Sequence, residues 1–289
     1  MVYLSNRPYI DGPRYAMAPL TLARQQSAYY AEHHDYCDES PHLKHRRVFV
    51  QLLSSVLTSL DRLRARGLEP TVLEVGAGDG AFVEPLLARG VRVIATETSE
   101  AAFSYLTTTY GSNPQFAALH DIDGSLSILE DHRVSLILFS SVLHHIPDYL
   151  TALATSIDHH LLPGGAVITL QDPLWYPRLP LGVHAASEAS FLLWRLQRGN
   201  YIRGFRSRIR RARRKYDDRY PGDTVEYHAV RDGVDEIAIT RLLSPRFASV
   251  SVIKYWSTWL SSIQTIGERA GVANTFQVIA DDRLAPRQR

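Results

Sequence analysis

A carboxylate and three glycines lie close together in the segment 74–80, which reads Glu-Val-Gly-Ala-Gly-Asp-Gly. Glycine at every second position lets a backbone turn sharply and approach a ligand closely. The dinucleotide fingerprint needs its third glycine one residue later, and the Gly-Lys-Ser/Thr of a phosphate-binding loop is missing from the segment. The carboxylate of Glu74 would repel a pyrophosphate but attract an ammonium or sulfonium group. The segment therefore predicts a site for a cationic nucleoside.

A second carboxylate follows at a distance typical of nucleotide sites. Glu97 comes 23 residues after Glu74, at the end of the apolar run 91–96. A carboxylate near this offset can accept hydrogen bonds from both ribose hydroxyls. An ordinary exposed loop glutamate is the alternative, and the glycine-rich segment at the right distance favours the ribose interpretation.

Two adjacent histidines, His144 and His145, follow the apolar run 134–139. The pKa of a histidine lies near neutrality, so its imidazole suits the removal of a proton from a hydroxyl group. Adjacent residues do not share a face, so we expect at most one of the two to point into a cleft. Packing of both rings is the alternative.

These groups need structural elements that bring them together. Apolar runs typical of strands occupy 71–75, 91–96, 116–120, 134–139 and 166–171. Helical spacing of apolar residues covers the intervening segments 48–63, 81–90, 99–110 and 148–161. Such alternation predicts a parallel sheet covered by helices on both faces, with ligands at the carboxyl ends of the strands. After residue 233 we expect a helix at 234–243, a strand at 247–256, a helix at 258–269 and a strand at 275–281.

In these features the chain resembles the class I S-adenosylmethionine-dependent methyltransferases. The motifs that carry the resemblance are Glu74–Gly80, Glu97, His120-Asp121-Ile122, Ser140–Asp148 and Leu161–Gly165. The resemblance covers about residues 48–173 and 234–281. It implies an α/β fold with a Rossmann-like, doubly wound sheet of about seven strands, the last one antiparallel. It also implies S-adenosyl-L-methionine as the cofactor and S-adenosyl-L-homocysteine as its product.

The resemblance assigns roles to individual residues. The first motif wraps the methionine part of the cofactor, and Glu97 binds the ribose. Asp121 bonds to the adenine amino group, with Asp123 as the alternative, and Ile122 packs on the ring. The implied cofactor-binding residues are Glu74, Gly76, Ala77, Gly78, Gly80, Glu97, Thr98, Asp121, Ile122 and Ser140. One departure is Val134-Ser135, where the family often has Phe-Asp.

The resemblance also implies a small-molecule acceptor, with oxygen as the expected methylated atom. His144 matches the position of the histidine base in small-molecule methyltransferases that use one, and we predict it as the general base. The expected acceptor-binding residues are His33, Tyr36, His42, Asp172 and Trp175. A metal is not expected, because neither a cysteine nor a close acidic partner completes a site around His42 and His45. The alternatives are an RNA methyltransferase, a cofactor-retaining protein that does not methylate (pericyclase-like or a binding protein), and a nicotinamide oxidoreductase.

The segment 174–233 interrupts the alternation of strands and helices. We interpret it as a helical, arginine-rich lid between the fifth and sixth strands, with a cap at 1–47 and the core at 48–173 and 234–289. Residues 195–219 carry ten Arg and one Lys against two Asp. Apolar residues recur there at helical spacing, which predicts an amphipathic helix docked on the core. An acidic carrier protein or an anionic substrate is the alternative partner, and nucleic acid is disfavoured because no recognised binding module accompanies the block.

The net charge of the whole chain does not show that the excess of basic side chains is confined to residues 195–219. The 289 residues include 32 basic and 30 acidic side chains, a net charge of +2, but outside 195–219 there are 21 basic and 28 acidic ones. The 45% of hydrophobic residues excludes disorder, and the single Cys37 excludes an internal disulfide and fits a reducing compartment. No signal peptide or membrane span is expected, since the most apolar run is 134–143. We therefore expect a cytoplasmic protein, and exposed apolar side chains on the lid would favour a homodimer.

Overall fold

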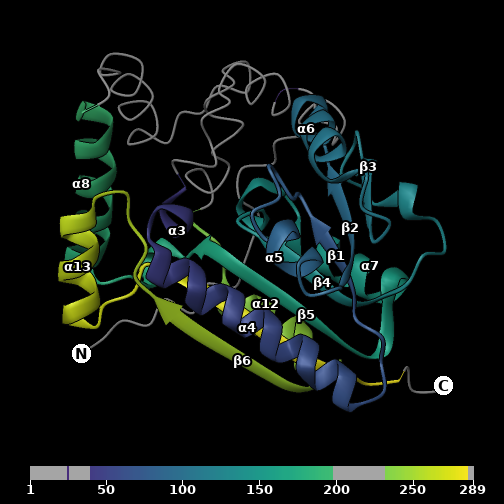
Figure 1. Cartoon of the computed structure of the whole chain (residues 1–289). Coiled ribbons are helices and arrows are strands. Elements are labelled where there is room, and N and C mark those ends of the chain that lie inside the picture. The colour runs from purple at the N-terminus through teal and green to yellow at the C-terminus, as the bar shows by residue number, and fades with distance from the viewer. Residues whose placement is uncertain (1–24, 26–39, 198–231, 286–289) are drawn as a thin grey trace.

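The computed structural model describes residues 25, 40–197 and 232–285, and its strands form one mixed sheet (Figure 1). The strands are β1 (Thr71–Val75), β2 (Arg92–Glu97), β3 (Phe116–His120), β4 (Val134–Ser140), β5 (Leu161–Pro173), β6 (Phe247–Tyr255) and β7 (Thr275–Arg283). Their order across the sheet is β3-β2-β1-β4-β5-β7-β6. The first five are parallel, and β7 runs antiparallel to β5 and β6. This confirms the predicted fold class, a Rossmann-like doubly wound sheet whose last strand is antiparallel.

The central strands form because their apolar runs are continuous. All residues of β4 except the last are buried, as expected for a strand covered on both faces. Neighbouring side chains alternate between two cores. Leu73 and Ile137 contribute to the core on one face, whereas Val72 and Leu136 contribute to the core on the other.

Helices cover both cores. The helices are α3 (Pro41–Lys44), α4 (Arg46–Ala65), α5 (Val83–Leu87), α6 (Glu100–Tyr110), α7 (Tyr149–His160), α8 (Leu181–Gln197), α12 (Glu236–Leu243) and α13 (Ser261–Ala270). Side chains of α4, α5 and α6 pack in one core, and those of α7 and α12 pack in the other. None of the helices among the described residues is long and apolar enough to cross a membrane.

Two elements differ from the sequence-based expectation. The helix predicted at 81–90 is limited to α5, because Gly80 to Phe82 form turns and Gly90 adopts a left-handed backbone. The strand predicted at 166–171 is longer, since β5 begins at Leu161 and includes Pro163-Gly164-Gly165, residue types that are typical of a turn. The register between β4 and β5 shifts near this sequence, so the strand accommodates it as an irregularity.

The two ends of the segment 174–233 lie side by side. Leu174 and Val234 form a parallel bridge, and the Val234 N–H donates to the Pro173 carbonyl at 2.9 Å. The described part of this segment contains α8, which lies beside α13 (Figure 1). The ring of Phe191 on α8 lies 4.7 Å from that of Trp259, which precedes α13. Residues 198–231, with most of the arginine block, lie outside the described residues, so the lid stays a prediction.

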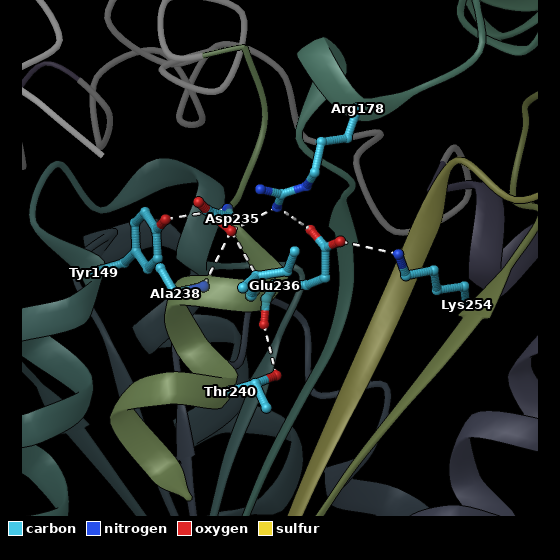
Figure 2. Close-up of polar contacts among 8 residues, drawn as sticks. Tyr149, Arg178, Asp235, Glu236, Ala238, Thr240 and Lys254 are labelled. Atoms are coloured by element: carbon cyan, nitrogen blue, oxygen red, sulfur yellow. Dashed lines mark hydrogen bonds and ion pairs between the residues drawn. The ribbon is translucent and has the colours of Figure 1, made fainter. Parts of the chain in front are cut away.

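A partly buried network of ion pairs stabilises this junction (Figure 2). Arg178 donates to Asp235 at 2.5 Å and to Glu236 at 2.6 Å, and Lys254 on β6 donates to Glu236 at 2.9 Å. Asp235 also caps α12 by accepting the Ile237 and Ala238 N–H groups. Burial would raise the pKa of Asp235, but its bonds to Arg178 and to the cap hold that pKa below its usual value. The network ties the chain after β5 to α12 and β6.

Candidate functional site

The predicted site residues gather at the carboxyl edge of the parallel strands. The register aligns Val75 with Thr96 and Phe139, so the glycine-rich loop, Glu97 and the end of β4 lie next to one another. The order in which successive strands are added to the sheet reverses between β1 and β4. Open α/β sheets bind ligands in the crevice at such a point.

The loop after β1 needs its glycines for two reasons. Gly76 and Gly78 have φ angles of 65° and 56°, in the left-handed region that residues with a Cβ avoid. A Cβ on Gly76 would lie 2.6 Å from Cγ2 of Val142, so Gly76 also permits close approach of the β4–α7 connection. A Cβ on Gly78 would meet no atom of the described residues within 4 Å, so no described side chain covers the backbone there. The loop thus offers its backbone to a ligand at Gly78.

Glu97 lies directly opposite this loop. Its Oε2 accepts the Gly78 N–H at 2.9 Å, and its Oε1 accepts the N–H groups of Thr98 at 2.8 Å and Ser99 at 3.0 Å. Burial raises the pKa of Glu97, and these three hydrogen bonds oppose that rise. The carboxylate therefore joins the glycine-rich loop to the start of α6, at the place predicted for a ribose-binding acid.

Glu74 is buried one strand away, with 1% of its surface exposed. Its Oε2 has no hydrogen-bond partner within the described part of the chain. Burial, with a smaller contribution from the negative charge of Glu97, raises the pKa of Glu74 to about 8. A buried carboxyl group that lacks a partner is unfavourable, and a bound cation would compensate for it.

The two acids after β3 differ in their surroundings. Asp121 is buried and accepts the Leu126 N–H at 3.0 Å, and burial raises its pKa to about 6. Asp123 is exposed and accepts the Ser125 N–H at 3.0 Å. Between them, Ile122 exposes 52% of its surface, which is high for an apolar side chain. The prediction that Asp121 and Ile122 hold an adenine ring stays a prediction, with Asp123 as the alternative.

His144 and Asp172 form a buried pair at the ends of β4 and β5. The Nδ1 atom of His144 lies 2.8 Å from Oδ1 of Asp172, and the backbone N–H of His144 donates to the same oxygen at 3.1 Å. The side chains of the two residues expose 8% and 0% of their surface. Since a carboxylate only accepts hydrogen bonds, Nδ1 carries the proton and Nε2 is the basic nitrogen of the ring. This arrangement can receive a proton and stabilise the resulting imidazolium.

Residues 73–167 match the sequence model of a methyltransferase domain. The chain therefore contains a methyltransferase domain, which supports the predicted class I S-adenosylmethionine-dependent family. No curated protein sequence matches this methyltransferase.

Solved structures are similar to the chain, and those with a TM-score above 0.5 share its fold at low sequence identity. The plantazolicin methyltransferase BpumL in complex with SAH is 11% identical, with a TM-score of 0.51 over 92% of this chain and 95% of that chain. BpumL in complex with a monoazolic desmethylPZN analog and SAH is 9% identical, with a TM-score of 0.51 over 92% and 98% of the two chains. A SAM-dependent methyltransferase from Archaeoglobus fulgidus is 13% identical, with a TM-score of 0.49 over 88% and 99% of the two chains.

Some of the remaining predicted site residues lie at this edge of the sheet, and others lie elsewhere in the chain. Ala77 and Gly80 belong to the glycine-rich loop, and Ser140 ends β4 at the same edge. His42 on α3 is buried, and burial lowers its pKa to about 3. His33 and Tyr36 lie outside the described residues. Within 25, 40–197 and 232–285, no group of three or more His, Cys, Asp or Glu residues is placed to hold a metal.

Sequence reasoning missed the residues that shape the end of β5. Gln171 has a φ angle of 65°, although it is not a glycine, and it bonds to Tyr255 and Ser257. Trp175, a predicted acceptor-binding residue, lies under the Arg178 guanidinium at 4.5 Å from the ring centroid. The contacts of Gln171 have no sequence signal, because they join positions whose proximity depends on the sheet.

Proposed function

We propose that this methyltransferase methylates a hydroxyl oxygen of a small-molecule acceptor, with His144 as the general base. The observation that carries the proposal is the 2.8 Å contact between Nδ1 of His144 and Oδ1 of Asp172. It supports a ring held in one orientation and one tautomer, as proton removal requires. A small-molecule acceptor is also favoured by the fold shared with the plantazolicin methyltransferase BpumL, which was solved in complex with a monoazolic desmethylPZN analog.

The glycine-rich edge fits S-adenosylmethionine, which supplies an activated methyl group when bound. Glu74 offers a buried carboxyl oxygen without a partner among the described residues, and no described side chain covers the backbone at Gly78. A ligand with positive charge would favour the ionised form of Glu74. Glu97 would accept hydrogen bonds from the ribose hydroxyls, and Asp121 with Ile122 would hold the adenine. The SAH in the BpumL complexes supports the same cofactor.

The chemistry required of the protein is then positioning and proton removal. When bound, the cofactor would supply the methyl group and would take up the electron pair of the broken C–S bond, so the protein has to hold the acceptor oxygen and remove its proton. The hydroxyl proton passes to Nε2 of His144, while the Nδ1–H group stays bonded to Asp172. The negative charge of Asp172 stabilises the imidazolium that forms. Burial of both side chains keeps water from competing for the proton.

The test is activity of His144→Ala against a panel of phenols, amines and carboxylates. We expect kcat for phenols to fall by about 10²- to 10⁴-fold, because general-base catalysis contributes about that much. Calorimetry should show unchanged affinity for S-adenosylhomocysteine, since His144 is not assigned to the cofactor. His159→Ala, at an exposed histidine of α7 outside the site, is the control and should retain activity. Full activity of His144→Ala would refute the assigned base. A wild-type enzyme that prefers amines, with no loss of that activity in His144→Ala, would also refute it.

The cofactor assignment has its own test. Calorimetry with S-adenosylhomocysteine should show binding to the wild type and weak binding to Glu97→Ala, which loses the proposed ribose acceptor and the bond to Gly78. Unchanged affinity in the variant would overturn the role of Glu97. Thermal shifts with NAD and NADP should be absent, and a shift would favour the oxidoreductase alternative.

A further inference from the structure

β5 contains one extra residue immediately before Asp172. Leu170 pairs with Gln277 on β7, whereas Asp172 pairs with Phe276, the residue directly adjacent. Two residues of β5 are thus matched by a single step on β7, and the unmatched residue is Gln171. Its φ angle of 65° is in the left-handed region. Together these features define a β-bulge.

This bulge decides which face of the sheet Asp172 points to. Side chains two apart in a regular strand share a face, so Asp172 would otherwise point to the same side as Leu170. Leu170 packs in the core beneath α4, and its pairing partner Gln277 bonds to Ser55 of α4. Phe276, the pairing partner of Asp172, packs in the opposite core. An extra residue moves the following side chains to the other face, so the bulge brings Asp172 to the side where Leu143, next to His144, is buried.

Tyr255, the last residue of β6, holds the bulge in place through two hydrogen bonds to Gln171. Its Oη accepts the Gln171 N–H at 2.9 Å and donates to Gln171 Oε1 at 3.1 Å. The other end of the same amide, Nε2, donates to Ser257 Oγ at 2.9 Å. The left-handed backbone is unfavourable for a glutamine, so it persists only where the surroundings hold it in place. The three hydrogen bonds to Tyr255 and Ser257 do so.

The Tyr255 hydroxyl keeps its proton at neutral pH. Burial raises the pKa of Tyr255 well above its usual value, and the negative charge of Asp172 raises it further. The O–H group is therefore available to donate to Gln171 throughout the range in which the enzyme would work.

We propose that Tyr255 is a positioning residue of the methyl-transfer site: its hydroxyl holds the Gln171 bulge that directs Asp172 onto His144. The inference rests on the proposed function only in naming His144 as the base. Tyr255 itself touches neither His144 nor the acceptor in this assignment and acts through Gln171 and Asp172.

The test uses the full-length protein labelled with ¹⁵N-histidine. The His144 signals are assigned by their loss in His144→Gln, and their ¹⁵N shifts report which ring nitrogen carries the proton. In Tyr255→Phe we expect a smaller fraction of the Nδ1–H form, because Asp172 is held less firmly. The kcat should fall on the order of 10-fold with an unchanged KM for S-adenosylmethionine, as expected for misplacement of a base.

Two further variants separate this role from general stability. Tyr149→Phe removes a buried hydroxyl that accepts the Asp235 N–H in the core that also contains Leu143, and it should leave the His144 tautomer unchanged. The double variant Tyr255→Phe/Gln171→Gly should recover part of the Nδ1–H fraction, because glycine adopts a left-handed backbone without strain.

The outcomes decide between the two proposals. An unchanged tautomer in Tyr255→Phe, an equal change in Tyr149→Phe, or no recovery in the double variant overturns the role of Tyr255. Full activity of His144→Ala refutes the base instead, and in that case the NMR result still decides whether Tyr255 positions Asp172.

Discussion

Glu74 and Glu97 place two carboxyl groups at the ends of neighbouring strands, and the described residues offer hydrogen-bond donors to both oxygens of Glu97 but not to Oε2 of Glu74. Glu97 accepts three backbone N–H groups, whereas Oε2 of Glu74 has no partner among the described residues. Burial and the charge of Glu97 raise the pKa of Glu74 to about 8. The folded protein therefore keeps a proton on Glu74 at neutral pH, at the position where we propose that a cationic ligand binds.

Replacement of Glu74 by Gln should stabilise the folded protein in a pH-dependent way. An unfolded glutamate loses its proton near its ordinary pKa of about 4.3, but folded Glu74 retains it up to about pH 8. The free energy of unfolding of the wild type therefore falls across this interval as pH rises. The Tm of Glu74→Gln minus that of the wild type should increase from pH 5 to pH 8 and then level off. The exposed Glu84→Gln is the control, and a flat difference for Glu74→Gln would contradict the shift.

Alanine at Gly76 and at Gly78 should have different consequences. Both residues are left-handed, which costs an alanine about 1 to 2 kcal/mol. At Gly76 the new Cβ would also lie 2.6 Å from Val142, which adds about 1 to 3 kcal/mol of overpacking. Chemical denaturation should therefore rank Gly76→Ala as the less stable variant. Val142→Ala should restore part of the stability of Gly76→Ala but none of that of Gly78→Ala, and equal effects of Val142→Ala would refute the clash.

Continuous apolar runs made most of the sheet predictable. The strands at 71–75 and 116–120 were predicted with the bounds of β1 and β3, and the antiparallel last strand is confirmed. The prediction for β5 was wrong in extent, because Pro163-Gly164-Gly165 is typical of a turn and only its neighbours keep it within a strand. Residue patterns describe local preference, whereas pairing with a neighbouring strand can override it.

The candidate site was predictable residue by residue but not as a set of contacts. His144 and Asp172 were each predicted for separate roles, and their 2.8 Å contact was not. That contact depends on a bulge at Gln171, and a glutamine in the left-handed conformation has no sequence signature. Tyr255 was missed for the same reason, since it lies 84 positions from Gln171 in the chain.

Arg178→Met should destabilise the protein more than loss of an exposed ion pair. The substitution leaves Asp235 without its cationic partner and leaves Glu236 with Lys254 alone (Figure 2). Removing one partner of a fully buried pair costs about 3 to 5 kcal/mol. We expect a smaller loss here, because 27% of the Arg178 side chain is exposed. Arg64→Met, which breaks the exposed pair with Asp61, should cost about 0.5 kcal/mol or less. Equal losses in urea denaturation would show that the network contributes no more than a surface pair.

His42→Phe should protect the protein against acid. Burial lowers the pKa of folded His42 to about 3, whereas an unfolded histidine binds a proton below about pH 6.5. The unfolded state therefore gains protons first, and the free energy of unfolding falls by about 1.4 kcal/mol per pH unit below that point. The Tm of His42→Phe minus that of the wild type should rise as pH falls from 7 to 5, opposite in sign to the change expected for Glu74→Gln. The exposed His159→Gln is the control, and a pH-independent difference for His42→Phe would show that His42 is charged in the folded state.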